Sequence, residues 1–349
     1  MKLKIAIVGF GGQGGWHAKQ IMKNEVAEVV GVCDIKPSRL EYAKENGIPT
    51  YATYEDLLAG DADVVVVATP NDVHKSLCIK ALRAGKHVVC EKPVTLSVVD
   101  FDEIVKVAKE CGKVFEVHQN RRWDTDFLAI KNLIATEQIG KPLYIASYVQ
   151  GSRGIPGDWR QLKAQGGGMI LDWGVHMIDQ MLQLVKSPIT SLYCKTTHYT
   201  NAEVDDGYKM FIYFENGVVG YTEVGTYNFI SQGRYYAQFE QGTAFIPDWH
   251  DDVLVRECLN WGEGDVHPVQ TASGITKTMA PRSDASVKEY RIPQPTSDVH
   301  DFYRNLKDTI EGKAEQLVRH GEVRRVLQVM EAAFASAASN TVVKFDPAI

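Results

Sequence analysis

KIAIVGFGGQG, residues 4–14, decides the fold of the first part of the chain. The apolar run from Ile5 to Val8 is followed by glycines at positions 9, 11 and 14, in the pattern G-x-G-x-x-G, and then by a helix-like segment. Such a run suits a strand buried on both faces, and the glycines let the backbone approach a pyrophosphate at the amino end of a helix. The sequence therefore predicts a strand–turn–helix unit that binds a dinucleotide.

Strand-like and helix-like segments continue to alternate as far as residue 119. The apolar runs EVVGVCD, ADVVVVATP and HVVCEKP are separated by segments with helical spacing, such as PSRLEYAKENG and VHKSLCIKALRAG. Because continuous Val/Ile runs joined by helices are typical of parallel sheets, we expect a doubly wound α/β domain over residues 1–119.

Asp34 indicates which nicotinamide cofactor the domain takes. It ends the second apolar run, 20 residues after Gly14, where a carboxylate accepts hydrogen bonds from the adenosine ribose hydroxyls. The same charge repels a 2′-phosphate, and Lys36 and Arg39 lie close enough in sequence to offset part of that repulsion. We expect NAD rather than NADP.

Two later strand ends, ATPNDVH and CEKPV, are placed where a doubly wound sheet binds ligands. His74 is either a cofactor contact or a structural histidine at a helix start, and Lys92 either lies at the cofactor edge or is a solvated surface lysine. The expected cofactor-binding residues are Gly9, Phe10, Gly11, Gly12, Gln13, Gly14, Asp34, Thr69, Pro70, Asn71, His74, Glu91 and Lys92.

The remainder, residues 120–349, reads as a second domain dominated by long strand-like stretches. Segments such as PLYIASYVQG and GYKMFIYFENG alternate in polarity, and turn pairs at 216–217 and 241–242 indicate a large, open, mostly antiparallel sheet. The second apolar face of this sheet predicts a homodimer or homotetramer. Residues 262–286 carry little pattern and are expected to form a surface loop or flap.

GGGMILDWGVHMID, residues 166–179, carries a polar stripe on a helix-like run. At about 100° per residue, Asp172, His176 and Asp179 fall on one face of a largely apolar helix. Such a stripe faces solvent, a structural hydrogen-bond network or a cavity in which acid and imidazole do chemistry. We expect the three preceding glycines to let the backbone pass close to a bound ligand.

Composition excludes several classes of protein. A chain of 349 residues with 44% hydrophobic and 23% charged residues is expected to form two globular domains. A net charge of −6 without a basic patch argues against nucleic-acid binding. The first apolar run is too short for a signal peptide or a membrane span, so we expect a cytoplasmic protein. Six scattered cysteines without a C-x-x-C pair indicate buried thiols and no metal site.

The order GFGGQG, Asp34, ATPNDVH, CEKPV and GGGMILDWGVHMID resembles the Gfo/Idh/MocA oxidoreductases, the group of glucose–fructose oxidoreductase and inositol dehydrogenase. The resemblance covers essentially the whole chain. It implies a Rossmann domain, an α/β domain with a large open sheet, and an active site between them built from Lys92, Asp172 and His176. It also points to sugars, polyols, inositols or glycosides as substrates.

The chemistry of alcohol oxidation suggests a role for each of these three residues. A proton must leave the hydroxyl while a hydride leaves carbon, so one group accepts the proton and another stabilises the alkoxide. An unperturbed imidazole is mostly neutral at pH 7, which suits His176 to the first role, whereas a charged Lys92 suits the second. We expect Asp172 to orient the imidazole.

The substrate-binding residues are less sharply marked. Charged and aromatic side chains gather in NRRWDTDF and GIPGDWRQLK, and they either bind a polyhydroxylated ring or tie the domains together. The expected substrate contacts are Arg122, Trp123, Trp159, Arg160, Asp172 and His176. Two rival functions are a redox-neutral enzyme that retains and recycles its NAD, of glycosidase or dismutase type, and a non-catalytic dinucleotide sensor.

Overall fold

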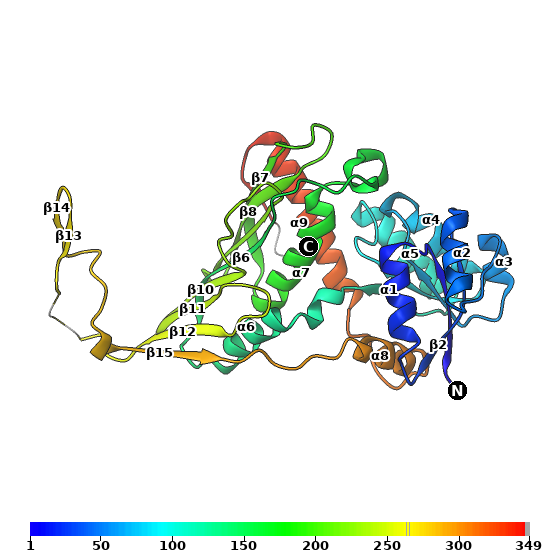
Figure 1. Cartoon of the computed structure of the whole chain (residues 1–349), viewed down its shortest axis with the longest axis horizontal. Helices are drawn as coiled ribbons and strands as arrows, with labels where there is room; N and C mark the ends of the chain where they lie inside the picture. Colours follow the sequence, from blue (N-terminus) through cyan, green and yellow to red (C-terminus); the bar gives the residue numbers. More distant parts are fainter. Residues whose placement is uncertain (263, 265, 346–349) are drawn as a thin grey trace.

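The computed structural model describes residues 1–262, 264 and 266–345. Within this part of the chain, the strands form a five-stranded sheet, a nine-stranded sheet and a two-stranded ribbon. The two large sheets lie in separate parts of an elongated molecule, with the first strands and helices at one end (Figure 1). Both sheets that the sequence predicts are present, which confirms the fold class.

The first sheet is parallel throughout, in the order β2-β1-β3-β4-β5. Its strands are β1 (Leu3–Val8), β2 (Ala27–Cys33), β3 (Val64–Val67), β4 (His87–Glu91) and β5 (Phe115–His118). The connecting helices are α1 (Gly12–Ile21), α2 (Pro37–Glu45), α3 (Tyr54–Ala59), α4 (His74–Arg83) and α5 (Val98–Glu110). Chain order reverses between β1 and β3, so a ligand crevice opens beyond the carboxyl ends of these two strands.

The second sheet has the order β15-β12-β11-β10-β6-β9-β8-β7-β16. Its neighbours run antiparallel except β6 and β9, which pair in parallel. The strands are β6 (Pro142–Gln150), β7 (Ile189–Thr197), β8 (Gly207–Phe214), β9 (Val219–Gly225), β10 (Tyr235–Phe239), β11 (Gly242–Ile246), β12 (Val253–Cys258), β15 (Val287–Ile292) and β16 (Val343–Lys344). The hairpin β8–β9 turns at the predicted pair 216–217, which confirms that turn. The hairpin β10–β11 turns at residues 240–241, one residue before the predicted pair, because Gly242 already pairs with Phe239.

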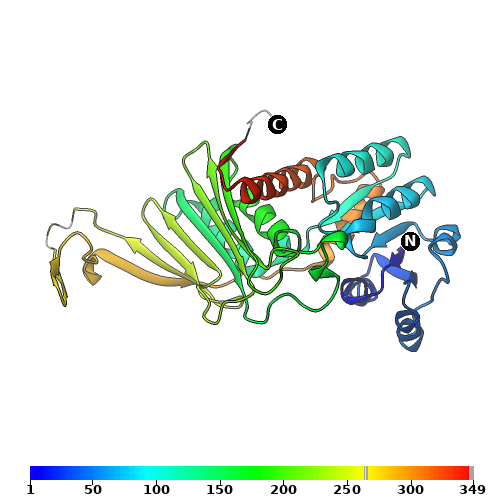
Figure 2. The ribbon, with the colours of Figure 1, turned by 90° about the horizontal axis from the view of Figure 1, so that it is seen from above.

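Helices cover one face of this sheet and leave the other open. The covering helices are α6 (Thr125–Thr136), α7 (Val175–Leu184) and α9 (His320–Ser339). Figure 2 shows α7 (green) and α9 (red) against the same side of the sheet. Along β8 the residues Met210 and Ile212 are buried, whereas Phe211 and Tyr213 are 37% and 39% exposed on the opposite face. This open aromatic face is the one from which we expect association, and that expectation stays a prediction.

One helix of the carboxyl-terminal half returns to the first sheet. Helix α8 (His300–Ile310) contributes Phe302, Tyr303 and Leu306 to the hydrophobic core that contains Ile5 and Ile7 of β1. We propose that the chain divides after residue 119, with α8 as the segment that crosses back to the first domain. This crossing brings the buried phenol of Tyr303 close to α1, the helix that follows the glycine-rich turn.

The segment expected to be a patternless loop forms a small hairpin instead. Strands β13 (Val269–Thr271) and β14 (Gly274–Thr276) pair in an antiparallel ribbon that projects far from both sheets (Figure 1). All but one of its strand residues are exposed, so it is a flap with local order. Part of the predicted loop, residues 263 and 265, lies outside the described residues.

Two expectations from composition bear on the fold. Among the described residues, no helix is long and apolar enough to cross a bilayer. All six cysteines are free thiols, and the side chains of Cys33, Cys78, Cys90 and Cys194 are buried as expected, whereas Cys111 and Cys258 are half-buried.

Candidate active site

The glycine-rich turn contains glycines that the packing requires and glycines that leave the backbone open. Gly9 has φ +88°, and a Cβ there would meet the carbonyl oxygen of Ala68 at 2.4 Å, while a Cβ on Gly14 would meet the carbonyl oxygen of Gly9 at 1.9 Å. These two glycines are required by the fold itself. Gly11 and Gly12 have nothing within 4 Å of a Cβ, so their backbone stays open for close approach of a ligand. This combination fits a dinucleotide pyrophosphate at the start of α1.

The Asp34 carboxylate is held at the mouth of this turn by two backbone amides. Oδ2 accepts a hydrogen bond from the N–H of Phe10 at 2.6 Å, and Oδ1 accepts one from the N–H of Lys36 at 2.8 Å. A carboxylate oxygen accepts more than one hydrogen bond, so both oxygens keep a lone pair for ribose hydroxyls. The geometry suits the predicted role of Asp34.

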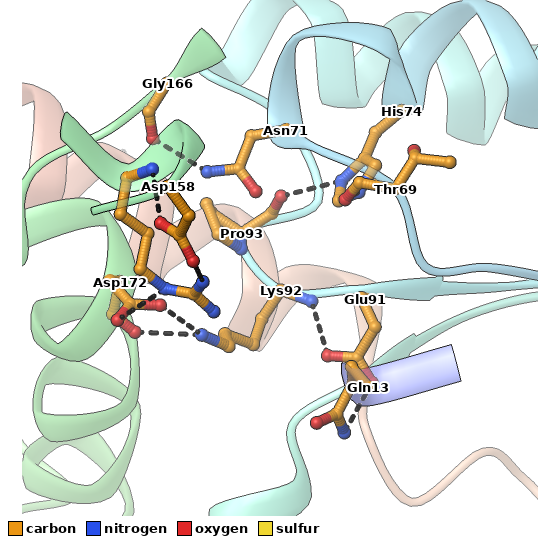
Figure 3. A network of polar contacts seen from close by, with 11 residues as sticks. Gln13, Thr69, Asn71, His74, Glu91, Lys92, Pro93, Asp158, Gly166 and Asp172 are labelled. Atoms are coloured by element: carbon orange, nitrogen blue, oxygen red, sulfur yellow. Dashed lines mark hydrogen bonds and ion pairs between the residues drawn. The ribbon is translucent and has the colours of Figure 1, made fainter. Parts of the chain in front are cut away.

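The strand-end loops after β3 and β4 are braced by His74 and Asn71 (Figure 3). The two ring nitrogens of His74 face the carbonyl oxygens of Thr69 and Pro93, at 2.9 and 3.0 Å, and the ring is fully buried. The Asn71 amide donates to the carbonyl oxygen of Gly166 at 2.8 Å. His74 therefore fits the structural alternative, and a direct cofactor contact by this ring stays a prediction.

A buried carboxylate, that of Glu91, connects the glycine-rich turn to Lys92. It accepts hydrogen bonds from the side chain of Gln13 at 3.2 Å and from the backbone N–H of Lys92 at 3.3 Å. The imidazoles of His17 and His118 lie 2.8 and 2.7 Å from Oε1. Burial would raise the pKa of this carboxyl, but His118 and His17 hold the pKa well below its usual range. Glu91 is therefore a buried anion.

Lys92 reaches from the end of β4 to the segment that precedes α7 (Figure 3). Its ammonium lies 2.9 Å from the carbonyl oxygen and 3.1 Å from Oδ1 of Asp172. The second carboxylate oxygen of Asp172 is 3.2 Å from Nε of Arg160, which in turn contacts Asp158 at 2.8 Å. Burial would raise the pKa of Asp172, but Lys92 and Arg160 hold it below its usual value. Asp172 is an ionised bridge between two cations.

The predicted pairing of Asp172 with His176 is wrong. The segment Ile170–Gly174 is a π-helical turn, in which the N–H of Val175 donates to the carbonyl oxygen of Ile170, five residues earlier. A π turn is wider than an α turn, so a spacing of four residues no longer places two side chains on one face. Asp172 therefore turns towards Lys92 and Arg160.

His176 is a buried imidazole with a free nitrogen. Only 5% of the residue is exposed, and Nδ1 has no hydrogen-bond partner among the residues that the structure describes. Burial, followed by the positive charges of Lys92 and Arg121, holds its pKa well below the usual range. The ring is therefore neutral at pH 7, and its role as proton acceptor stays a prediction.

Asp179, the third residue of the predicted stripe, belongs to a structural ion-pair network. Its carboxylate receives two hydrogen bonds from Arg122, at 2.8 and 2.5 Å, and Arg122 also contacts Glu322 at 2.8 Å. Because this guanidinium is occupied by protein carboxylates, Arg122 fits the tie between chain segments rather than a substrate contact. Trp123 packs edge-on against Phe302 of α8, so it also lies in a structural contact.

The three glycines before the π turn serve internal packing. A Cβ on Gly166 would meet a side-chain carbon of Leu96 at 2.7 Å, one on Gly167 the carbonyl oxygen of Arg160 at 2.3 Å, and one on Gly168 the carboxylate of Asp205 at 2.3 Å. These close approaches are to protein atoms, so packing within the chain requires each glycine, and a close approach of this backbone to a ligand stays a prediction.

Two tryptophans near His176, Trp173 and Trp249, were not predicted as site residues, whereas Arg121 belongs to the segment NRRWDTDF in which substrate contacts were expected. The guanidinium of Arg121 lies 4.1 Å from the ring centre of Trp173 and 5.5 Å from that of Trp249. Trp173 also contacts the His176 ring edge-on, at 5.9 Å between centroids. Trp249 lies in the loop after β11, 73 residues beyond His176, and no local sequence pattern connects the two.

The comparisons with known proteins cover both halves of the chain. Residues 3–119 match the family model described as an oxidoreductase family with an NAD-binding Rossmann fold. Residues 127–245 match the model of the GFO/IDH/MocA C-terminal domain.

Individual relatives share the fold over nearly the whole length. The crystal structure of an NAD-binding protein from Listeria innocua is 43% identical, with a TM-score of 0.90, over 99% of this chain and 97% of that one. The NADP⁺-dependent scyllo-inositol 2-dehydrogenase IolW of Bacillus subtilis is 27% identical over 96% of this chain and 93% of its own. An NAD⁺-dependent scyllo-inositol 2-dehydrogenase of the same organism is 31% identical over 55% of this chain and 56% of its own.

Proposed function

Since the chain belongs to the Gfo/Idh/MocA family of NAD-binding oxidoreductases, we propose that it is a dehydrogenase acting on CH–OH groups. It transfers a hydride between a nicotinamide cofactor and a secondary alcohol or ketone of a sugar, polyol, inositol or glycoside. The observation that carries this proposal is the ion pair of Lys92 with Asp172 beside a buried, neutral His176.

The proposed chemistry assigns one task to each of the three residues. Bound nicotinamide supplies the hydride acceptor, so the protein must handle the hydroxyl proton and the negative charge on oxygen. His176 accepts the proton, since its imidazole is neutral and lies near the ammonium of Lys92. Lys92 donates a hydrogen bond to the developing alkoxide, and Asp172 fixes the direction of that ammonium through two contacts.

The charges near these residues favour an uncharged substrate. Lys92, Arg160 and Arg121 are matched by Asp172, Asp158 and Asp124, each in an ion pair. A site with balanced charge offers many hydrogen-bond donors and acceptors but no excess positive charge that would bind an anionic group. Trp159 lies under the guanidinium of Arg160, so an aromatic face is also available, as in sites for polyhydroxylated rings.

The cofactor proposal is NAD in preference to NADP. The support is the fixed Asp34 carboxylate, because its charge opposes a 2′-phosphate. Relatives of both cofactor types are similar to this chain, so similarity alone does not decide between them.

A panel assay tests the proposed function. Purified protein is incubated with sugars, polyols, inositols and glycosides, with NAD and NADP in separate wells, and reduced cofactor is followed by absorbance at about 340 nm. We expect steady release of NADH with at least one neutral polyhydroxylated substrate. Product formation without NADH release would instead favour an enzyme that retains and recycles its cofactor, and binding of NAD without turnover of any substrate would favour a sensor.

A further inference from the structure

Four buried polar side chains from distant parts of the chain meet behind the catalytic lysine. His17 lies on α1, Glu91 ends β4, His118 ends β5 and Tyr303 lies on α8. His17, His118 and Tyr303 are 0% exposed and Glu91 is 4% exposed. We name this set the Glu91 cluster. Nothing in the proposed hydride transfer requires it directly.

Hydrogen-bond chemistry determines where the protons of the Glu91 cluster lie. Oε1 of Glu91 is 2.8 Å from Nε2 of His17 and 2.7 Å from Nδ1 of His118, and an ionised carboxylate only accepts hydrogen bonds. Both of these ring nitrogens must therefore carry a hydrogen. The remaining nitrogen of His17, Nδ1, lies 2.8 Å from the hydroxyl of Tyr303. We assign the phenol as the donor in this contact, which gives His17 the neutral Nε2–H tautomer.

In this assignment, the second nitrogen of His118 carries no proton. Nε2 is buried and has no partner among the residues that the structure describes. A protonated Nε2 there would be a charged donor without an acceptor, which is the costlier of the two states. The proton order is thus Tyr303 to His17 to Glu91, with His118 donating to Glu91 from the other side.

The same residues have the composition of a His₂Glu metal site, but their spacing fits hydrogen bonds. Two ligands about 2.1 Å from a tetrahedral zinc ion lie about 3.4 Å apart. Both imidazole nitrogens are closer than that to Oε1 of Glu91, at 2.8 and 2.7 Å. These distances are those of charge-assisted hydrogen bonds.

Glu91 connects the cluster to the proposed active site through two hydrogen bonds. Its carboxylate accepts the backbone N–H of Lys92 and the side chain of Gln13 in the glycine-rich turn. We propose that Tyr303, His17 and His118 are positioning residues that keep Glu91 a carboxylate and so fix Lys92 and the cofactor turn as one unit. This inference deepens the proposed function and rests on it for the role of Lys92.

The proton order is tested on the ligand-free protein, independently of any substrate. Long-range ¹H–¹⁵N NMR of histidine-labelled protein near neutral pH should give the Nε2–H tautomer for His17 and the Nδ1–H tautomer for His118. An imidazolium signal from either ring, the opposite tautomers, or one equivalent of tightly bound zinc by elemental analysis would each overturn the proposal.

The positioning role is tested with Tyr303→Phe against the matched control Tyr54→Phe. Tyr54 is also buried in the first domain, and its hydroxyl donates to the carbonyl oxygen of Leu77, away from the site. Tyr303→Phe should change the His17 tautomer signal, raise the Kd for NAD severalfold and lower kcat about tenfold, as for other partners of a catalytic group. Tyr54→Phe should leave the His17 tautomer signal unchanged and keep both the Kd for NAD and kcat within about twofold of the wild-type values.

The test separates this inference from the proposed function. If no substrate is found, the tautomers and the Kd for NAD still decide on the cluster. Equal tautomer signals and equal Kd for the two tyrosine variants would overturn the inference while leaving the dehydrogenase proposal intact. Glu91→Gln is a second variant. It removes the anion and should weaken NAD binding more than Tyr303→Phe, whereas unchanged binding would also overturn the inference.

Discussion

The ammonium of Lys92 and residue Asp172 are joined by two contacts, at 2.9 Å to the carbonyl oxygen and at 3.1 Å to the carboxylate. The two residues are 80 positions apart, one at the end of β4 and the other in the π-helical turn before α7. This contact closes the parallel-sheet domain against the helix that carries His176. The proposed catalytic groups are therefore brought together by tertiary structure, and removal of either side chain should change the position of the other.

Asp172→Asn should lower kcat about 10- to 100-fold and leave the Kd for NAD nearly unchanged, because the amide keeps the shape but loses the charge that directs Lys92. Lys92→Ala should damage both turnover and cofactor binding. Steady-state kinetics and NAD titration measure these effects. Asp102→Asn, which removes an exposed ion pair with Arg324, is the control and should leave kcat and the Kd for NAD unchanged. Equal kcat for Asp172→Asn and wild type would contradict the assignment.

Cofactor choice should follow Asp34. We expect kcat/KM with NAD to exceed that with NADP by a factor of about ten or more, corresponding to about 1.4 kcal/mol. Asp34→Ala should bring the kcat/KM values for NAD and NADP closer together, since both carboxylate oxygens and their charge are lost. Equal use of the two cofactors by the wild type would mean that Lys36 or Arg39 compensates for the charge.

Glu116 should make the fold less stable as the pH rises. Its side chain is fully buried on β5 without a hydrogen-bond partner in the described part of the chain, and burial raises its pKa to about 8. Between about pH 4.5 and 8 the folded protein keeps a proton that the unfolded chain has released, so the free energy of unfolding falls as pH increases.

Glu116→Gln should therefore raise the melting temperature at pH 8 and flatten its dependence on pH, with little effect near pH 5. Thermal unfolding across this range measures the difference. Glu110→Gln on the exposed end of α5 is the matched control and should keep the wild-type slope. A wild-type slope in Glu116→Gln would show that this carboxyl titrates normally.

The open face of the nine-stranded sheet should hold two or four subunits together. Phe211 and Tyr213 stack on this face, with ring centroids 6.5 Å apart, and are 37% and 39% exposed. Phe211→Glu should shift the mass by light scattering towards the monomer, because a buried unpaired charge opposes association. Phe334→Glu, a similarly exposed phenylalanine on α9, should not. A monomeric wild type at micromolar concentration would contradict the prediction.

Local patterns in the sequence were sufficient for the first sheet and for the glycine-rich turn. The four valines of β3 are all buried, as a continuous apolar run predicts for a central parallel strand. Gly9 and Gly14 lie at a turn whose tight packing only glycine satisfies. These features depend on neighbours within a few residues, which is why a sequence pattern records them.

Local sequence patterns could not predict which residues contact Asp172 and His17, because those contacts join distant parts of the chain. The π turn at Ile170–Gly174 is stabilised by Asp205, whose carboxylate accepts the N–H of Ile170 at 2.7 Å from 35 residues away. Tyr303 reaches His17 across 286 positions because α8 returns to the first sheet. The helical spacing of residues 172 and 176 predicted a pair that this long-range anchoring rules out.

His176 should control the acid limb of activity. Because its pKa is held well below the usual 6.5, the neutral base form persists as the pH falls below that value. We therefore expect kcat/KM for alcohol oxidation to stay level through the range near pH 6.5 in which an ordinary imidazole titrates, and to fall only well below that range. A decline that begins above pH 7 would assign the limb to another group.

The most direct measurement is turnover by folded His176→Ala, together with its melting temperature and its Kd for NAD, beside the control His320→Ala. His320 is a partly buried histidine whose ring contacts the backbone of Phe115, away from the site. We predict that His176→Ala lowers kcat by about 10²- to 10⁴-fold while NAD affinity and melting temperature stay close to those of the control. Normal turnover in folded His176→Ala would contradict the account and would leave Lys92 as the proton acceptor.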